Sequence, residues 1–153
     1  MFNFFRKKEE FKIVSPAEGK LIPLAEVKDG VFSEKIMGDG FAVIPENGTI
    51  CAPLSGTAET VFHTGHAVGI ATKDGIECLV HIGLETVNLN GEGFETLIRQ
   101  GDKVKAGQPI VKFDKDLVEG KGYNIVTIVV FPSGYDQAFD LGSKKVEAGE
   151  KLV

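Results

Sequence analysis

The chain has 153 residues, of which 42% are hydrophobic and 25% are charged, and its formal net charge at pH 7 is −5. This length and composition are typical of one globular domain with a substantial core. The acidic balance argues against nucleic acid as the main partner, because a surface that follows phosphates needs excess Lys and Arg; it suits a basic protein partner. No apolar run approaches the roughly 18 residues of a membrane span, and the first residues lack the long apolar region of a signal peptide, so we expect a cytoplasmic protein.

The first ten residues differ in composition from the rest of the chain. They hold three Phe, three basic residues and two Glu, and we predict that residues 1–10 form a flexible N-terminal tail. A second interpretation is a weak contact of residues 1–8 with an anionic membrane surface. Residues 11–153 are predicted to form a single domain.

From residue 11 onward the sequence is typical of short strands separated by Gly, Pro and Asp. Nineteen Gly and the lack of a long stretch with a period of 3.6 predict an all-β fold with at most short helical turns. The one short helix that we predict covers residues 93–100, where three apolar residues have helical spacing. Cys51 and Cys78 share no CxxC spacing and lie in apolar runs, so we predict reduced thiols in the core.

Two short patterns each occur twice, which predicts a duplicated unit. Residues 15–21 resemble residues 52–58 through Pro-x-x-Gly, and residues 103–107 resemble residues 145–149 through Val-x-Ala-Gly. In each copy Pro or Gly sets the backbone of a tight turn next to a strand. Paired turns of this kind indicate a duplicated β unit that closes into a sandwich or barrel.

Two of the three histidines flank a predicted hairpin. His66 and His81 lie on either side of Asp74-Gly75, a dipeptide that favours a tight hairpin turn. A two-residue loop, or a four-residue loop from Thr72 to Gly75, would place both imidazoles on one face of the strands. A three-residue loop would place them on opposite faces. We therefore predict a loop of even length and a site that the two histidines share.

Two neutral imidazoles on one face could bind a metal, act as an acid–base pair, or divide the roles of nucleophile and product stabiliser. The alternative is that one of them is a packing histidine. Thr64, two residues before His66, could fix the tautomer of that ring. The backbone carbonyl of Gly83 could hold Nδ1–H of His81 and leave its Nε2 free as a nucleophile. We expect His63 to project to the opposite face and lie at the surface.

Other chemistry has less support in the sequence. No Gly-x-Ser-x-Gly nucleophile motif is present, and Ser55 lies in a plain turn. A zinc site could combine His66, His81 and a carboxylate such as Asp39 or Glu85 on paper. The sequence has no HExxH or His-x-His motif to accompany it.

Five segments carry a resemblance to a known family. They are, in chain order, residues 31–40 (VFSEKIMGDG), 52–56 (APLSG), 64–67 (TGHA), 79–87 (LVHIGLETV) and 89–94 (LNGEGF). Together they resemble the glucose-class enzyme IIA of the bacterial phosphoenolpyruvate:sugar phosphotransferase system, over a range from about residue 11 to the C-terminus. The resemblance implies an antiparallel β-sandwich of the duplicated, barrel-sandwich hybrid type.

The resemblance also implies a mechanism. His81 matches the histidine that accepts a phosphoryl group, His66 matches the histidine that stabilises it, and Thr64 matches the hydroxyl that contacts the second ring. The family receives the phosphoryl group from the phosphocarrier protein HPr and passes it to a cysteine of the enzyme IIB domain of a glucose-type permease. No cofactor is required in principle, although Zn²⁺ at His66 and His81 is an option because some members bind it there with a carboxylate from a partner.

A docking face for the two partners follows from the same resemblance. Its apolar residues would be Val31, Phe32, Ile36, Met37, Phe62, Val68 and Leu79. Asp39 and Glu85 would be acidic residues at its rim that steer a basic HPr toward the site. An apolar rim would exclude water, so that the phosphoryl group is transferred to a protein and not to solvent.

Other interpretations remain for comparison. Residues 101–108 (GDKVKAGQ) resemble a turn of zinc peptidases on a similar scaffold and of biotinyl or lipoyl carriers. The peptidases need His-x-His with an upstream His and Asp, and the carriers need a hairpin-tip Lys in a Met-Lys-Met or Asp-Lys-Ala setting; the sequence lacks both. A regulatory module, in which phosphorylation of His81 switches target proteins, is compatible with the phosphocarrier role.

Overall fold

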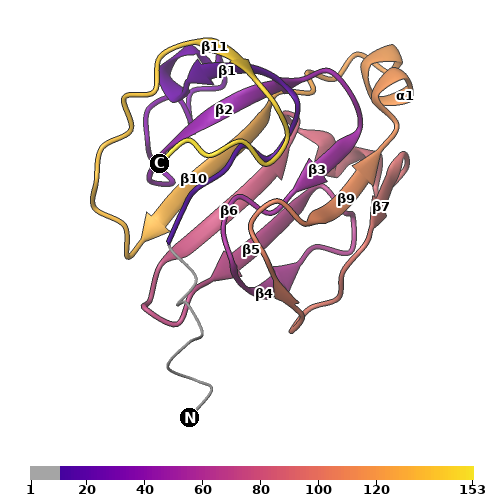
Figure 1. Cartoon of the computed structure of the whole chain (residues 1–153). Coiled ribbons are helices and arrows are strands. Elements are labelled where there is room, and N and C mark those ends of the chain that lie inside the picture. Colours follow the sequence, from indigo (N-terminus) through magenta and orange to yellow (C-terminus); the bar gives the residue numbers. More distant parts are fainter. Residues whose placement is uncertain (1–10) are drawn as a thin grey trace.

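The computed structural model of the chain describes residues 11–153 (Figure 1). The predicted tail of residues 1–10, and with it the suggested membrane contact of residues 1–8, lies outside the described residues. The described chain forms two antiparallel β-sheets with one short α-helix, as predicted for an all-β fold. None of the helices in this range has the length and apolar character of a membrane span.

The larger sheet has eight strands in the order β11-β1-β2-β10-β6-β5-β4-β8. In chain order they are β1 Gly19–Pro23, β2 Asp39–Pro45, β4 Gly56–Val61, β5 Ala67–Ala71, β6 Glu77–Ile82, β8 Lys103–Val104, β10 Thr127–Ser133 and β11 Lys144–Val146. The smaller sheet, in the order β3-β9-β7, consists of β3 Thr49–Cys51, β7 Phe94–Thr96 and β9 Pro109–Phe113. The helix is α1 Lys115–Gly120, and 3₁₀ turns cover Leu24–Glu26 and Thr86–Leu89.

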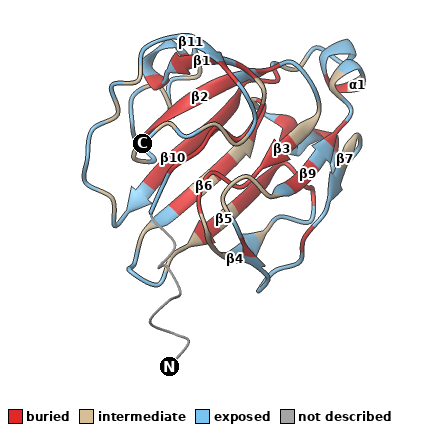
Figure 2. Cartoon of the chain, in the orientation of Figure 1, coloured by how far each residue is buried: buried red, intermediate tan, exposed pale blue. Residues whose placement is uncertain are grey.

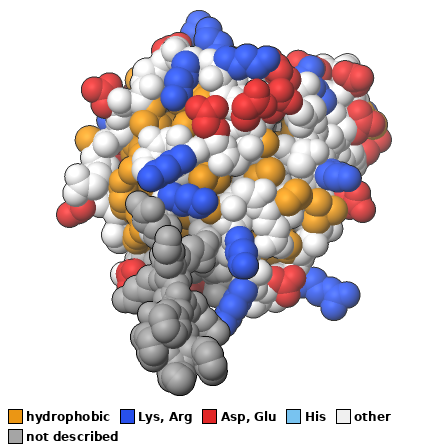
Figure 3. Space-filling model, in the orientation of Figure 1, with side chains coloured by type: hydrophobic (Ala, Val, Ile, Leu, Met, Phe, Trp, Pro, Cys, Tyr) orange, Lys and Arg blue, Asp and Glu red, His pale blue; other side chains and the backbone are white. Residues whose placement is uncertain are grey.

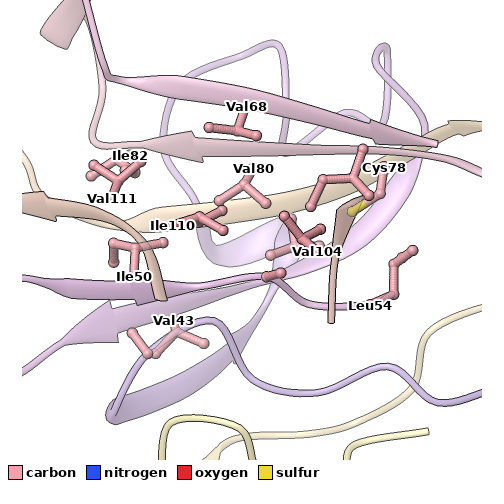
Figure 4. Close-up of a cluster of buried hydrophobic side chains, with 14 of the residues drawn as sticks. Val43, Ile50, Leu54, Val68, Cys78, Val80, Ile82, Val104, Ile110 and Val111 are labelled. Atoms are coloured by element: carbon pink, nitrogen blue, oxygen red, sulfur yellow. The ribbon is translucent and has the colours of Figure 1, made fainter. Parts of the chain in front are cut away.

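The main core lies between the two sheets. Val68 and Val80 of the larger sheet and Ile50 and Val111 of the smaller one belong to a single buried cluster (Figure 4). In Figure 2 the buried residues follow the central strands, while the outer loops and strand ends are exposed. Burial of these side chains is the main source of stability for a sandwich of this size.

The central strands of the larger sheet are buried on both faces. Along β2, Phe41 and Val43 belong to the main core, whereas Ala42 belongs to a second, smaller cluster with Ile22 and Ile128. Because successive side chains of a strand point to opposite faces, the second cluster lies on the outer side of the sheet. Its partly buried members are Phe32, Leu79 and Leu84.

The repeated turns meet around a pseudo-two-fold axis. Each backbone hydrogen bond made by one copy of a repeated pattern has a counterpart at the equivalent residues of the other copy. The related pairs are Val14 N–H to Pro53 O with Cys51 N–H to Pro16 O, Ser15 N–H to Glu150 O with Ala52 N–H to Gln108 O, and Gly149 N–H to Ser15 O with Gly107 N–H to Ala52 O. The predicted duplication is therefore confirmed, and the fold is a duplicated β-sandwich.

The helix predicted for residues 93–100 is wrong. Part of this range is strand β7, which pairs with β9 in the smaller sheet, and Gly93 enters it with a φ of +85° that no α-helix contains. The helix forms instead at α1. Asp114 caps it, because its carboxylate accepts a hydrogen bond from Leu117 N–H at 3.1 Å.

Both cysteines are core residues. Cys51 in β3 and Cys78 in β6 are free and buried, which confirms the prediction of reduced core thiols. Burial raises the pKa of each thiol above its ordinary value. The thiolate is disfavoured at both positions, so neither cysteine offers a nucleophile near pH 7.

The close approach of β2 and β10 leaves no room for a side chain at Gly40. A Cβ there would lie 1.8 Å from the Val129 carbonyl oxygen, whereas a Cβ at Gly69 in β5 would lie 3.5 Å from the Thr60 side chain. We expect Gly40→Ala to lower the free energy of unfolding by about 2 kcal/mol or more, and Gly69→Ala to change it by less than about 0.5 kcal/mol. Urea denaturation of both variants tests this; equal losses would contradict it.

Candidate functional site

The hairpin of β5 and β6 has a loop of three residues, so the prediction of an even loop is wrong. Ala67 pairs with His81 and Val68 pairs with Val80. The loop is closed by hydrogen bonds from Gly75 N–H to Thr72 O and from Thr72 N–H to Ile76 O. Gly75 has a φ of +89°, which is typical of the last residue of a three-residue hairpin loop.

The two imidazoles nevertheless meet, because His66 lies just before the regular part of β5. Gly65, with a φ of +73°, turns the chain immediately ahead of it, and Ile82 N–H donates to the His66 carbonyl oxygen at 2.7 Å. The ring centroids of His66 and His81 are 5.1 Å apart and the rings are nearly perpendicular, at 83°. Side chains alternate between faces only within a regular strand, and His66 lies outside it. The turn at Gly65, and not the length of the hairpin loop, therefore brings the two rings together.

His81 has one nitrogen that is free to react. Its Nδ1–H donates to the carbonyl oxygen of Gly83 at 2.8 Å. A carbonyl oxygen only accepts, so Nδ1 carries the hydrogen and Nε2 keeps its lone pair. Burial lowers the pKa of His81 below its ordinary value, and the Gly83 bond and the charge of Asp29 offset part of this effect. Neutral His81 therefore presents Nε2 as a nucleophile near pH 7.

His66 is more deeply buried than His81, at 5% exposure. Its Nδ1 is 2.5 Å from Thr64 Oγ1, and its ring meets that of Phe62 edge-on with centroids 5.4 Å apart. Burial, followed by the charges of His81 and His63, lowers its pKa to about 4. His66 is therefore neutral near pH 7. When the Thr64 hydroxyl donates to Nδ1, the hydrogen of the neutral ring is on Nε2.

Asp29 also belongs to the site, although no motif in the sequence singled it out. Its carboxylate accepts hydrogen bonds from the backbone N–H groups of Phe32 at 2.9 Å and Ser33 at 3.1 Å. Burial opposes the charged form, but these bonds outweigh it and hold the pKa of Asp29 below its usual value. They place Phe32 against His81, with ring centroids 5.1 Å apart. The dipeptide Asp29-Gly30, which is typical of a turn and directly precedes residues 31–40, is the sequence signal that could have pointed to Asp29.

A cavity of about 500 Å³ opens beside His81. Its lining residues are Lys28, Asp29, Val31, Phe32, His81, Leu84 and Glu85. Glu85 adopts a left-handed conformation, with a φ of 60°, and its side chain is exposed. The cavity thus combines apolar walls with the charged residues Lys28, Asp29 and Glu85.

Most of the predicted docking residues surround the histidine pair. Val31, Ile36, Met37 and Phe62 are exposed large hydrophobic residues, and Phe32 and Leu79 are half-buried. Met37, Phe62 and Leu79 line an apolar groove of about 330 Å³ in which Gly69 contributes no side chain. The structure therefore brings six of the seven apolar residues to this face.

Val68 and Asp39 do not lie on this face. Val68 is 1% exposed and points into the main core (Figure 4), so its prediction as a docking residue is wrong. The alternation of β5 turns its neighbour Gly69 outward instead. The Asp39 carboxylate accepts a hydrogen bond from Phe139 N–H at 3.3 Å and pairs with Lys35 at 3.6 Å. It lines a small cavity with Phe139, separate from the cavity at His81.

The ligands for a metal ion are incomplete in the described part of the chain. Among residues 11–153, no group of three or more His, Cys, Asp or Glu side chains is placed to hold one. A catalytic zinc ion takes at least three protein ligands, and the pair of His66 and His81 offers two. These residues do not fit a zinc site by themselves, so the geometry gives no support to the peptidase interpretation.

Comparisons with known proteins place the chain in a family. Residues 11–136 match the family described as phosphoenolpyruvate-dependent sugar phosphotransferase system, EIIA 1. The chain belongs to this family, the EIIA components of a sugar transport system. Membership agrees with the duplicated β-sandwich and with the resemblance of the five sequence segments.

Particular relatives come from bacterial sugar transport systems. The chain is 48% identical over 145 residues to the PTS system beta-glucoside-specific EIIBCA component of Bacillus subtilis (strain 168), covering 92% of this chain and 24% of that protein. It is 44% identical over 142 residues to the PTS system glucoside-specific EIICBA component of Staphylococcus carnosus (strain TM300), covering 92% of this chain and 20% of that protein. The chain thus spans about a fifth to a quarter of the length of these relatives.

A solved structure confirms the fold class. Glucose permease IIA from Mycoplasma capricolum superposes with a TM-score of 0.85 at 38% sequence identity, and the match covers 97% of this chain and 96% of that one. At this identity the two chains share much of their sequence as well as their fold. The predicted β-sandwich is therefore shown by both the strand pairing and this match.

The low pKa of His66 makes stability depend on pH. Between pH 6.5, its ordinary value, and about 4, its folded value, the unfolded chain binds more protons at His66 than the folded chain does. The free energy of unfolding therefore falls as the pH falls through this window. We expect His66→Gln to make the loss between pH 7.5 and 5 smaller than in the wild type, as measured by urea denaturation at both pH values. Identical losses in the two proteins would contradict the assignment.

Proposed function

We propose that this chain is a phosphocarrier: His81 Nε2 accepts a phosphoryl group from phosphorylated HPr and passes it to a cysteine of the enzyme IIB domain of a glucose- or glucoside-type permease. The observation that carries the proposal is the hydrogen bond from His81 Nδ1–H to Gly83 O. It leaves Nε2 as a free nucleophile next to a second neutral imidazole. Family membership and the printed names of the relatives support the setting.

The transfer consists of two in-line displacements. In the first, the N–P bond of the donor phosphohistidine breaks while a bond forms from phosphorus to His81 Nε2, and the electron pair of the broken bond stays on the donor imidazole. In the second, the His81 N–P bond breaks while a bond forms from phosphorus to the sulfur of the acceptor thiolate, and the electron pair of the broken bond returns to His81 Nε2. Negative charge spreads over the three equatorial oxygens in each transition state.

His66 is suited to stabilise that charge. With the Thr64 hydroxyl donating to Nδ1, the hydrogen on His66 Nε2 is available to a phosphoryl oxygen at the neighbouring ring. The bond to Thr64 and the contact with Phe62 hold the ring before the phosphoryl group arrives. Because the His66 ring is already in place, it needs little reorganisation during transfer, and this makes its stabilisation of the phosphoryl charge effective.

The groove beside the histidines supports a protein partner with apolar and basic residues. Met37, Phe62 and Leu79 offer apolar walls, and the exposed carboxylates of Glu59 and Glu77 lie along the same groove. A partner that buries an apolar side chain here would exclude water from the phosphoryl group. Basic residues around that side chain would meet the carboxylates and speed the encounter.

The charge distribution favours proteins over nucleic acid as partners. The chain has a net charge of −5, and on the face shown in Figure 3 Lys and Arg are interspersed with Asp and Glu. That face therefore lacks the continuous basic surface that would follow a phosphate backbone.

A regulatory role is a second candidate, favoured by the exposed apolar face. Phosphorylation of His81 would add about 1.5 to 2 negative charges near pH 7 beside the exposed hydrophobic residues. Partners that bind the apolar face of the free chain would then bind the phosphorylated chain less well. This candidate uses the same histidine and is compatible with phosphoryl transfer.

Phosphoryl acceptance is tested by intact mass. The chain is mixed with phosphoenolpyruvate, enzyme I and HPr. We expect a mass gain of one phosphoryl group that requires HPr, is absent in His81→Ala because the nucleophile is gone, and persists in His66→Gln. Onward transfer from phosphorylated His66→Gln to a IIB domain should be strongly reduced, because the charge is no longer stabilised. No mass gain in the wild type would overturn the proposal.

The docking groove is tested by filling it. Gly69→Leu adds a side chain inside the groove, whose lining includes neither histidine, and we expect it to lower kcat/KM for phosphorylated HPr about tenfold, mainly through KM. Lys112→Leu places the same side chain at an exposed position of strand β9 in the other sheet and serves as the matched control. Equal kinetics for the two variants would mean that the partner does not occupy the groove.

A further inference from the structure

We propose that Thr86 is a positioning residue for His81: its hydroxyl secures the loop after β6 so that the Gly83 carbonyl faces Nδ1 of the imidazole. The contacts that carry this inference are all within the chain. Its consequence for transfer rests on the proposed function, whereas its consequence for the His81 tautomer does not.

The first contact is at the end of β6. Ile82 is the last residue of the strand, and its N–H donates to the His66 carbonyl oxygen at 2.7 Å. On its other side, the Ile82 carbonyl oxygen accepts a hydrogen bond from Thr86 Oγ1 at 2.5 Å. Thr86 is 1% exposed, so water has little access to replace this bond. Ile82 thereby links Thr86 to the backbone of His66.

The second contact concerns the next residue along the chain. Gly83 N–H donates to Val126 O at 2.9 Å, and Leu84 N–H donates to Asn124 O at 2.9 Å. A Cβ added to Gly83 would lie 2.5 Å from the methyl group of Thr86 and 2.8 Å from the Asn124 carbonyl oxygen. Gly83, with a φ of +79°, is therefore packed closely against both the Thr86 side chain and the backbone that leads into β10. This position aims its carbonyl oxygen at His81.

The His81 tautomer depends on this arrangement. Which nitrogen of a neutral imidazole carries the hydrogen is set by the bond that the other nitrogen makes. Without the Thr86 hydroxyl, the Ile82 carbonyl is left unsatisfied in a buried place, and the loop must shift to satisfy it. A turned Gly83 carbonyl would release Nδ1–H. His81 would then populate the tautomer with hydrogen on Nε2, in which Nε2 has no lone pair to attack phosphorus.

The test compares Thr86→Val, which removes the hydroxyl and keeps the shape, with Thr86→Ser, which keeps the hydroxyl. Side-chain ¹⁵N NMR of the unphosphorylated full chain reports which nitrogen of His81 is protonated. We expect Nδ1–H in the wild type and Thr86→Ser, and a mixture of tautomers in Thr86→Val. The rate of phosphoryl acceptance from HPr should fall about tenfold in Thr86→Val, and remain near the wild-type rate in Thr86→Ser.

Thr127→Val is the matched control. Thr127 is fully buried in neighbouring strand β10, and its hydroxyl donates to Ile125 O at 3.3 Å. Its loss should reduce stability without changing the His81 tautomer. Unchanged Nδ1–H in a folded Thr86→Val would overturn the proposal, as would a tautomer change of equal size in Thr127→Val.

Two further outcomes are also decisive. If Thr86→Val does not fold, Thr86→Ala gives the same comparison with a smaller side chain. Failure of both variants to fold would overturn the proposal, because Thr86 would then be required for the fold itself. If the wild type accepts no phosphoryl group but the tautomer changes as expected, the proposed function fails and the positioning role stands.

Discussion

The register between β5 and β6 is the constraint on which the site depends. It places His81 opposite Ala67 and brings Ile82 N–H to the carbonyl oxygen of His66. A shift by one residue would turn Val80, which is fully buried, from the core to the outer face. β6 also lies between β5 and β10 in the sheet. The pairing therefore cannot slip, and the position of the imidazoles follows from the packing of the core.

Within that frame, the hydrogen bonds of the two imidazole rings are local to the turns at the strand ends. His81 and Gly83 are two residues apart, as are Thr64 and His66, and each pair forms one hydrogen bond. Burial keeps both rings neutral by penalising the charged form. A site of this kind holds one reactive nitrogen and one donor beside it without any fixed charge on either ring.

The exposed apolar residues around the histidines are supported from below by the second cluster. Phe32, Leu79 and Leu84 pack against it from the side of the site, so the docking face is an outward continuation of a buried layer. The face thus combines the loop between β1 and β2, which holds Val31, Ile36 and Met37, with strand β6, which holds Leu79.

The sequence by itself determined the all-β class and the duplication, because these follow from composition and from a repeated pattern. It also determined the contacts of Thr64 with His66 and of His81 with Gly83, because the residues of each pair are close together in the chain. The prediction of a helix at residues 93–100 was wrong because pairing of β7 with β9 outweighed the helical spacing of the apolar residues. Only the tertiary structure decided that the hairpin loop has three residues, that Val68 faces the core, and that Asp39 lies elsewhere. These features depend on strand register and on contacts between distant segments, which no local pattern in the sequence encodes.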